Sequence, residues 1–279
     1  MMMLSKTKWL LLSILYCHLL HPQAMTTVEV AKNLFMVGDR TFSLFYITDN
    51  GVVVIDPIDE VHAKATMKAV KKETNLPVTH VFYSHNHWDH ISGAHIFKDQ
   101  GATIISHLEA KKNIAPNENV LWPDITWEGN SKTYHIGNKD IELFYFGENY
   151  GKGMTTFRFP EHNSVFTIDL VVPDRVLYAY LPDASPTQWV SSLDKIDHLS
   201  FDTLLMSHVR AKGTRADLHA LQQYFKDLYA AVQYQLDQNT NLFDIPYKVQ
   251  LPKYKHWMNY DKWLPMNVWR ILMEKSIGQ

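Results

Sequence analysis

The alternation of apolar and polar residues divides the first part of the chain into strands and one long helix. It predicts strands over residues 28–37, 42–48 and 51–56, with a hairpin turn at Asp49-Asn50-Gly51. Apolar residues at helical spacing predict a helix over about 60–74, and Pro77 restarts the chain as a strand over 78–83. A histidine-rich loop, a short helix near 91–97 and a strand around 103–106 follow.

The second part repeats this mixture with longer runs of strands. Residues 131–168 are typical of consecutive strands, followed by a helix over 187–197 and a strand over 203–206. Thr214 with Asp217 predicts a capping box at the start of a helix whose apolar face holds Leu218, Leu221, Phe225, Leu228 and Val232. Because the strands come in runs, the pattern favours an α+β fold of mixed sheets covered by helices over a doubly wound parallel sheet.

The composition indicates one large domain and a metal. The chain has 279 residues, 46% of them apolar, and no repeat or linker divides residues 25–279, which end in an aromatic-rich tail from about 240. Charged residues make up 20% and the net charge is −2, so no basic footprint indicates nucleic acid as a partner. Fifteen histidines stand against one cysteine, and histidine is the usual ligand of catalytic zinc.

The first 24 residues have the pattern of a secretory signal peptide. Lys6 and Lys8 precede an apolar run over 9–20, and Ala24 supplies a small residue at the predicted break. The alternative is a retained membrane anchor, although the run is short for a bilayer. We therefore expect an exported protein, periplasmic or secreted, without stable membrane association once residues 1–24 are removed.

The segment Ser84-His85-Asn86-His87-Trp88-Asp89-His90 carries the most specific chemistry. It follows an apolar strand, and in extended backbone His85 and His87 point the same way and can bind one metal. Asp89 and His90 lie where the chain turns into a helix and can face a second metal. The alternative interpretation is a polar surface loop that is merely rich in histidine.

This motif and three further segments resemble the metallo-β-lactamase superfamily. The strand over 51–56 ends in Asp56, the strand over 166–170 carries Asp169, and Ser207-His208 precedes a Gly-Thr-Arg-Ala-Asp segment, all in the family's order. The resemblance implies a four-layer αββα sandwich of two mixed β-sheets and a small-molecule substrate. It implies one or two zinc ions bound by His85, His87, Asp89, His90, Asp169 and His208. An iron site that uses a tyrosinate is a further alternative, because phenolate suits a harder metal better than it suits zinc.

One departure from the family changes the expected metal site. Alignment of residues 146–154 places Tyr150 where the family has the third histidine of its first site. The second site keeps Asp89, His90 and His208, with Asp169 available to bridge, so it should bind metal more tightly than the first. Tyr150 either donates a hydrogen bond to the substrate or an oxyanion, or packs beside the pocket.

The resemblance and the motif together predict a metallo-hydrolase. Metal-bound hydroxide would attack an ester, lactone, thioester or similar bond, with Asp89 as both ligand and proton acceptor and Tyr150 as the second catalytic residue. The alternative is a non-catalytic metal-binding protein with a degenerate hydrolase site. His107 is expected to cap a helix, and Lys152 either attracts an anionic substrate group or is solvated.

Overall fold

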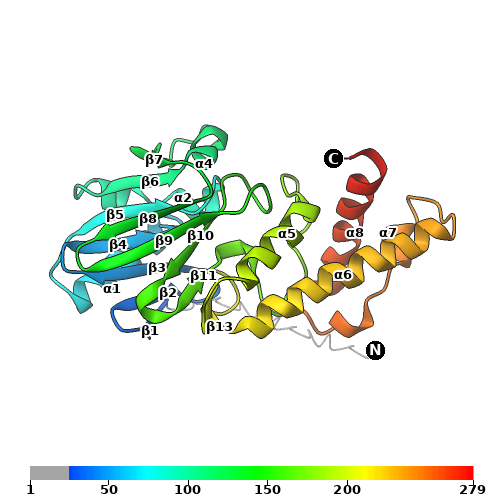
Figure 1. Ribbon diagram of the computed structural model, residues 1–279. Coiled ribbons are helices and arrows are strands. Elements are labelled where there is room, and N and C mark those ends of the chain that lie inside the picture. The colour runs from blue at the N-terminus through cyan, green and yellow to red at the C-terminus, as the bar shows by residue number, and fades with distance from the viewer. Residues whose placement is uncertain (1–24, 279) are drawn as a thin grey trace, which may run out of the picture.

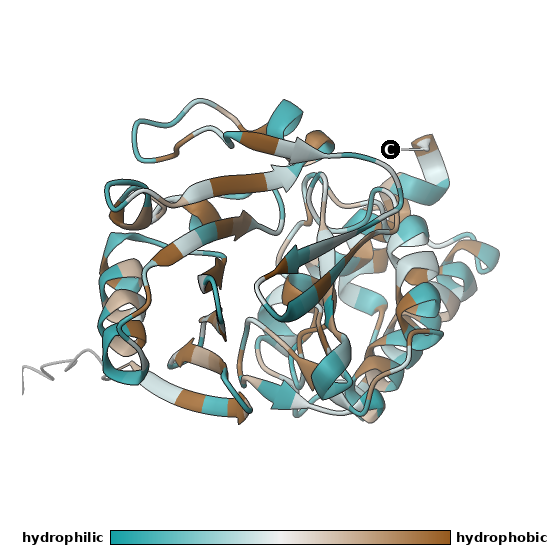
Figure 2. Ribbon diagram, turned by 60° about the vertical axis from the view of Figure 1, so that its left-hand side comes forward, coloured by the Kyte–Doolittle hydropathy of each residue, from teal (hydrophilic) through white to brown (hydrophobic). Residues whose placement is uncertain are grey.

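The computed structural model describes residues 25–278. Within them, two β-sheets pack face to face, with helices outside them (Figures 1 and 2). The predicted signal peptide lies outside the described residues. The arrangement confirms the prediction of a sandwich of two mixed sheets flanked by helices. Within residues 25–278, no helix has the length and apolar composition needed to cross a bilayer.

The first sheet has seven strands in chain order, antiparallel from β1 to β4 and parallel from β4 to β7. Its strands are β1 (Thr26–Ala31), β2 (Leu34–Gly38), β3 (Phe42–Thr48), β4 (Gly51–Ile55), β5 (Val78–Tyr83), β6 (Thr103–His107) and β7 (Ile125–Trp127). The prediction of one strand over 28–37 was wrong. Asn33 adopts a left-handed conformation with φ of 63°, which folds this segment into a hairpin that pairs Ala31 with Leu34.

The second sheet has six strands in the order β13-β12-β11-β10-β9-β8, and only the β11–β12 pair is parallel among its described pairs. Its strands are β8 (Ser131–Ile136), β9 (Lys139–Tyr145), β10 (Thr155–Phe159), β11 (Ser164–Phe166), β12 (Thr203–Leu205) and β13 (Lys212–Gly213). The two sheets are joined at one edge, where the amide of Phe42 donates to the carbonyl of Ser207 at 2.8 Å.

Three of the four longer helices described lie where the sequence predicts them, and the fourth, in the aromatic-rich tail, was not predicted. The four are α1 (Glu60–Glu73), α5 (Pro186–Asp197), α6 (Arg215–Asp237) and α8 (Tyr260–Ile277), with shorter α2 (Trp88–Ile91), α3 (His95–Lys98), α4 (Leu108–Asn113) and α7 (Ile245–Lys248). Three short 3-10 turns are η1 (Pro160–His162), η2 (Ile168–Leu170) and η3 (Pro252–Tyr254). The capping box of Thr214 and Asp217 begins α6 as predicted. Helix α1 contacts the first sheet, whereas α5 to α8 gather at the opposite end of the molecule (Figure 1).

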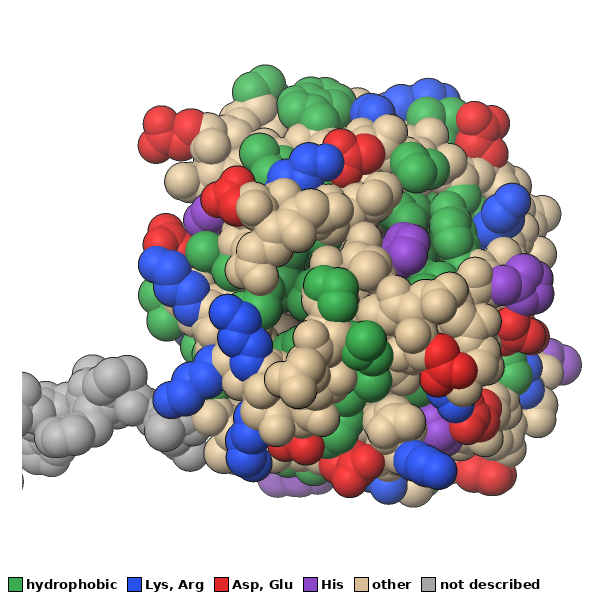
Figure 3. All heavy atoms as spheres, turned by 90° about the vertical axis from the view of Figure 1, so that its left-hand side faces the viewer, with side chains coloured by type: hydrophobic (Ala, Val, Ile, Leu, Met, Phe, Trp, Pro, Cys, Tyr) green, Lys and Arg blue, Asp and Glu red, His purple; other side chains and the backbone are tan. Residues whose placement is uncertain are grey.

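Two apolar cores hold these layers together. The larger core lies between the sheets and continues under the C-terminal helices, joining Phe157 of β10 to Phe225 of α6 and Val268 of α8. The smaller core lies between the first sheet and helices α1 and α3. Charges of both signs are interspersed on the outer surface shown in Figure 3, as on an ordinary solvated face.

The aromatic residues of the second half mostly pack into the domain. In the C-terminal tail, Tyr254, Trp257 and Tyr260 are buried, as expected of a tail that folds back. Trp127 is buried in β7, and the ring of Tyr134 lies edge-on to Phe82 between the sheets at 5.1 Å.

Replacing Phe157 with alanine tests the core between the sheets. The side chain is fully buried, so Phe157→Ala is expected to lower the free energy of unfolding by about 3–5 kcal/mol. Tyr234→Ala, at a side chain that is 61% exposed, should change it by less than about 0.5 kcal/mol. Urea denaturation followed by circular dichroism measures both, and equal midpoints for the two variants would contradict this account of the core.

Candidate metal centre

The candidate ligands follow the carboxyl ends of strands in both sheets. Asp56 follows β4, the histidine-rich loop follows β5, and His208 follows β12. Asp169 lies in η2, directly after β11. Since β4 and β5 are parallel, as are β11 and β12, these strand ends lie at the edge where the two sheets meet.

Within residues 25–278, three groups of metal-ligating side chains have their ligand atoms within 4.8 Å of one another. They are Asp56-His85-His90, His85-His87-Asp169 and His90-Asp169-His208. The structure therefore brings together five of the six ligands predicted from the sequence and adds Asp56. The sixth, Asp89, lies outside these groups, in the first turn of α2, where its exposed side chain lines the adjoining cavity.

Asp169 lies at the centre of the cluster. Its Oδ1 is 2.9 Å from Nε2 of His208, and its Oδ2 is 3.3 Å from Nε2 of His90 and 4.0 Å from Nε2 of His85. The hydroxyl of Ser207 also donates to Oδ1 at 2.8 Å. Burial alone would raise the pKa of Asp169, but the charges and hydrogen bonds of His90 and His208 hold it well below its usual range.

Asp56 orients the histidine-rich loop through hydrogen bonds to Ser84 and a contact with His90. Its carboxylate accepts hydrogen bonds from the backbone amide and hydroxyl of Ser84, at 2.8 and 2.6 Å, and lies 3.0 Å from Nδ1 of His90. The hydroxyl of Ser84 is in turn 2.8 Å from Nδ1 of His85. With Nδ1 engaged on both rings, the two Nε2 atoms are aimed at Asp169.

These residues fit a divalent metal ion. Nε2 of His85 is buried and has no hydrogen-bond partner within residues 25–278, a costly state for a polar atom. Gly151, with φ of 72°, leaves room beside the histidine rings. A Cβ atom added at this position would lie only 2.8 Å from Cδ2 of His85 and 3.3 Å from Nε2 of His87. Neutral imidazoles and carboxylates converging in this way are typical zinc ligands.

Tyr150 lies beside the first pair of histidines. Its ring centroid is 5.2 Å from that of His87 and 5.2 Å from that of Trp189 on α5, so it both faces the cluster and packs against the core. Burial, followed by the negative charges of Asp169 and Asp89, raises the pKa of the Tyr150 phenol far above its usual range. Without a metal to displace its proton, the hydroxyl is therefore a hydrogen-bond donor at neutral pH.

A cavity of about 400 Å³ opens onto the cluster. It is lined by His87, Asp89, Tyr150, Arg175, Tyr178, Pro182, Asp183 and His208. Sequence reasoning missed Arg175 and Asp183, which lie on the irregular connection between η2 and α5. Neither residue belongs to a spacing pattern, so the sequence carried no signal for them.

Arg175 brings a positive charge to this cavity. The C-terminal segment holds its backbone, because the amide of Met258 donates to the carbonyl of Asp174 at 2.8 Å. The guanidinium lies 5.6 Å from the centroid of the Trp263 ring of α8. Its Nε is buried and has no hydrogen-bond partner in the part of the chain that the structure describes.

Two other residues considered from the sequence lie apart from the cluster. His107 caps α4, accepting a hydrogen bond from the amide of Glu109 at 3.1 Å, and Lys152 pairs with Glu148 at 2.9 Å.

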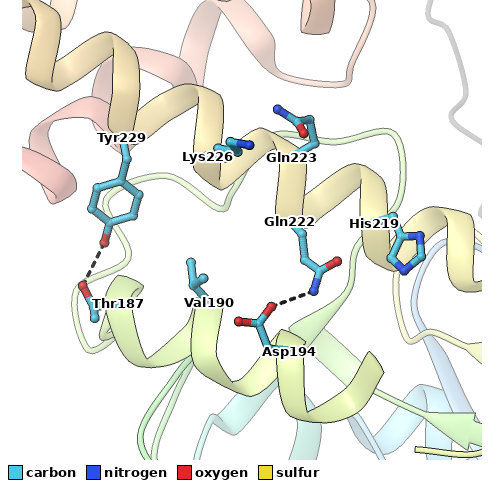
Figure 4. A pocket seen from close by; sticks show the side chains of 8 residues that line it. All are labelled: Thr187, Val190, Asp194, His219, Gln222, Gln223, Lys226 and Tyr229. Atoms are coloured by element: carbon cyan, nitrogen blue, oxygen red, sulfur yellow. Dashed lines mark hydrogen bonds between the residues drawn. The ribbon is translucent and has the colours of Figure 1, made fainter. Parts of the chain in front are cut away.

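A larger cavity of about 630 Å³ lies between α5 and α6 (Figure 4). In this cavity Thr187 of α5 forms a hydrogen bond with Tyr229 of α6, and Gln222 of α6 donates one to Asp194 of α5. None of the three candidate metal-ligating groups found in residues 25–278 includes a residue that lines it.

Most of the chain matches one known family of proteins. Residues 36–208 match the sequence profile of the metallo-beta-lactamase superfamily. Metallo-beta-lactamase IND-1 of Chryseobacterium indologenes is 23% identical over 182 residues, covering 63% of this chain and 75% of that protein. The alpha subunit of 2,4-dinitroanisole O-demethylase of Nocardioides sp. (strain JS1661) is 26% identical over 190 residues, covering 66% of this chain and 58% of the subunit.

Solved structures share the fold at low identity. A metallo-beta-lactamase from Pontibacter korlensis superimposes with a TM-score of 0.65 and 16% identity, over 72% of this chain and 99% of that one. The stereoselective inverting sec-alkylsulfatase Pisa1 from Pseudomonas sp. gives a TM-score of 0.77 with 16% identity, over 91% of this chain. The present chain thus spans half the length of the sulfatase.

The support from Asp56 can be tested with a shape-conserving change. Asn is expected to tolerate the left-handed backbone at position 56, where φ is 53°, but it has one acceptor oxygen in place of two, so it cannot keep both the hydrogen bond from the Ser84 amide and the contact with His90. Asp56→Asn should weaken metal binding about 10- to 100-fold, measured by competition with a chromophoric chelator. The exposed control Asp99→Asn should bind metal as the wild type does, and equal affinity in both variants would argue against the role of Asp56.

Proposed function

Because the chain belongs to the metallo-beta-lactamase superfamily, we propose that it is a zinc-dependent hydrolase of a small molecule containing an ester, lactone, thioester or similar bond. The observation that carries this proposal is the convergence of histidines on buried Asp169, next to a cavity of about 400 Å³. His85, His87, His90, Asp169 and His208 would hold the metal. A bound zinc ion would supply a water of lowered pKa and polarise the oxygen of the scissile bond.

The remaining chemistry falls to side chains of the cavity. Asp89 is exposed there and can accept the proton released when water attacks. Tyr150 keeps its proton and can donate a hydrogen bond to the oxygen on which negative charge develops. Trp189 packs against its ring and holds the hydroxyl in place.

The positive charge of Arg175 favours a substrate that carries an anionic group. A guanidinium whose Nε lacks a partner among residues 25–278 can form charge-assisted hydrogen bonds to a carboxylate, phosphate or sulfate entering the cavity. A sulfate ester meets this requirement, and sulfate esters are the substrates named for the structurally similar sec-alkylsulfatase. The pattern of residues 1–24 adds the proposal that the enzyme is exported and acts in the periplasm or outside the cell.

Removal of the metal tests the proposed activity. The purified protein, loaded with zinc, is assayed against ester, lactone, thioester, phosphodiester and sulfate-ester substrates, before and after treatment with a chelator. Loss of several kcal/mol of charge stabilisation should lower turnover roughly a thousandfold, and added zinc should restore it. His208→Ala should also lower turnover. Metal bound without turnover of any substrate would instead favour the non-catalytic metal-binding protein.

The role of Arg175 is tested with paired substrates of equal size, one anionic and one neutral. Arg175→Gln should raise KM for the anionic substrate about 10- to 100-fold, the effect of losing a charged hydrogen bond, and leave KM for the neutral one nearly unchanged. Lys152→Gln serves as control, since Lys152 is paired with Glu148 and does not line the cavity. Equal losses on both substrates would show that Arg175 acts through the fold and not on the anion.

A further inference from the structure

The connection that leads into α5 is fixed beside Tyr150. The amide of Ser185 donates to the carbonyl of Asn149 at 2.8 Å, and the side-chain amide of Asn149 donates to the hydroxyl of Ser192 on α5 at 3.1 Å. Asn149 is fully buried. These bonds place Asp183, two residues before Ser185, against the segment in which Tyr150 replaces the expected histidine.

The carboxylate of Asp183 points at the candidate cluster. Its Oδ2 is 2.8 Å from Nε2 of His87, and the side chain, 29% exposed, lines the cavity together with His87 and Tyr150. A carboxylate is an anion at neutral pH and a common ligand of divalent cations.

The choice of ring nitrogen separates the two kinds of partner in this site. Ser84 contacts Nδ1 of His85, and Asp56 contacts Nδ1 of His90. Such contacts orient a metal-binding histidine through the ring nitrogen that does not bind the metal. Asp169 contacts His90 and His208 through Nε2, on the side where ligand atoms converge. Asp183 contacts His87 through Nε2 and so resembles Asp169 and not Asp56.

We propose that Asp183 is the third protein ligand of the first metal site, together with His85 and His87. This inference rests on the metal dependence of the proposed function. Zinc–nitrogen and zinc–oxygen bonds of about 2.0–2.2 Å at tetrahedral angles separate neighbouring ligand atoms by about 3.4 Å. The Asp183 carboxylate now lies 2.8 Å from Nε2 of His87, so it must move away from His87 and closer to His85 for the three ligand atoms to surround one ion.

The assignment changes the expected balance between the two sites. Two histidines and one carboxylate form a common catalytic zinc set that leaves one position open. The first site then no longer lacks a protein ligand, and both sites are expected to fill. Tyr150, freed from binding metal, keeps its hydroxyl for the substrate.

Metal counting without substrate tests this assignment. Asp183→Asn and Asp183→Ala are compared with wild type and with Asp174→Asn, a control on the same connection whose carboxylate is 60% exposed and pairs with Arg210. After gel filtration, wild type and Asp174→Asn should retain two metals and the Asp183 variants one. The affinity of the first site should fall at least about 100-fold, beyond the usual effect of losing a residue that only orients a ligand.

Two further measurements separate a ligand from a structural residue. The absorption spectrum of the cobalt-loaded protein should lose the contribution of one four-coordinate ion in Asp183→Asn, while urea unfolding of the metal-free variant should match the wild type. Adding Tyr150→His to Asp183→Asn should restore the second metal by supplying a histidine at the family's position.

Unchanged metal content and affinity in both Asp183 variants would overturn the assignment. If the wild type also hydrolyses its substrate, that result leaves the proposed function intact. A wild type that binds no metal would overturn both proposals together.

Discussion

The candidate site depends on one buried carboxylate, Asp169, at the edge where the two sheets meet. An isolated buried anion is strongly unfavourable, so its neighbours must supply positive charge or hydrogen bonds. His90, His208 and Ser207 do so here, from loops that follow strands of both sheets. A divalent cation placed among these groups would satisfy Asp169 and also the buried Nε2 of His85, which the protein alone leaves without a partner in residues 25–278.

The C-terminal helices help to position the side chains that line the cavity. They lie beyond residue 208, where the match to the family profile ends, and their core is continuous with that between the sheets. Met258 and Trp263 hold the segment of Arg175, while α5 and Asn149 hold that of Asp183. The C-terminal helices therefore help to position Arg175, whereas Asp183 is positioned by elements inside the segment that matches the family profile.

The sequence predicted the elements whose signals are local. The helix from Thr214 and the strand over 78–83 followed from capping and periodicity, and the His-x-His-x-Asp-His motif pointed to histidines that the structure brings together with Asp169. The hairpin at Asn33 was missed because a single left-handed residue reverses an otherwise continuous apolar run. Arg175 and Asp183 were missed because their connection is irregular, with positive φ at Asp174, Ala179 and Leu181, and only tertiary contacts fix its path.

The most direct test of the account is an anomalous difference map at the zinc edge, from crystals of the protein grown with zinc. The account predicts two peaks at the edge where the sheets meet. One lies among His85, His87 and Asp183, and the other lies among His90, Asp169 and His208. Absence of any peak at this edge, with zinc bound elsewhere or not at all, would contradict the central claim that these residues form a metal centre.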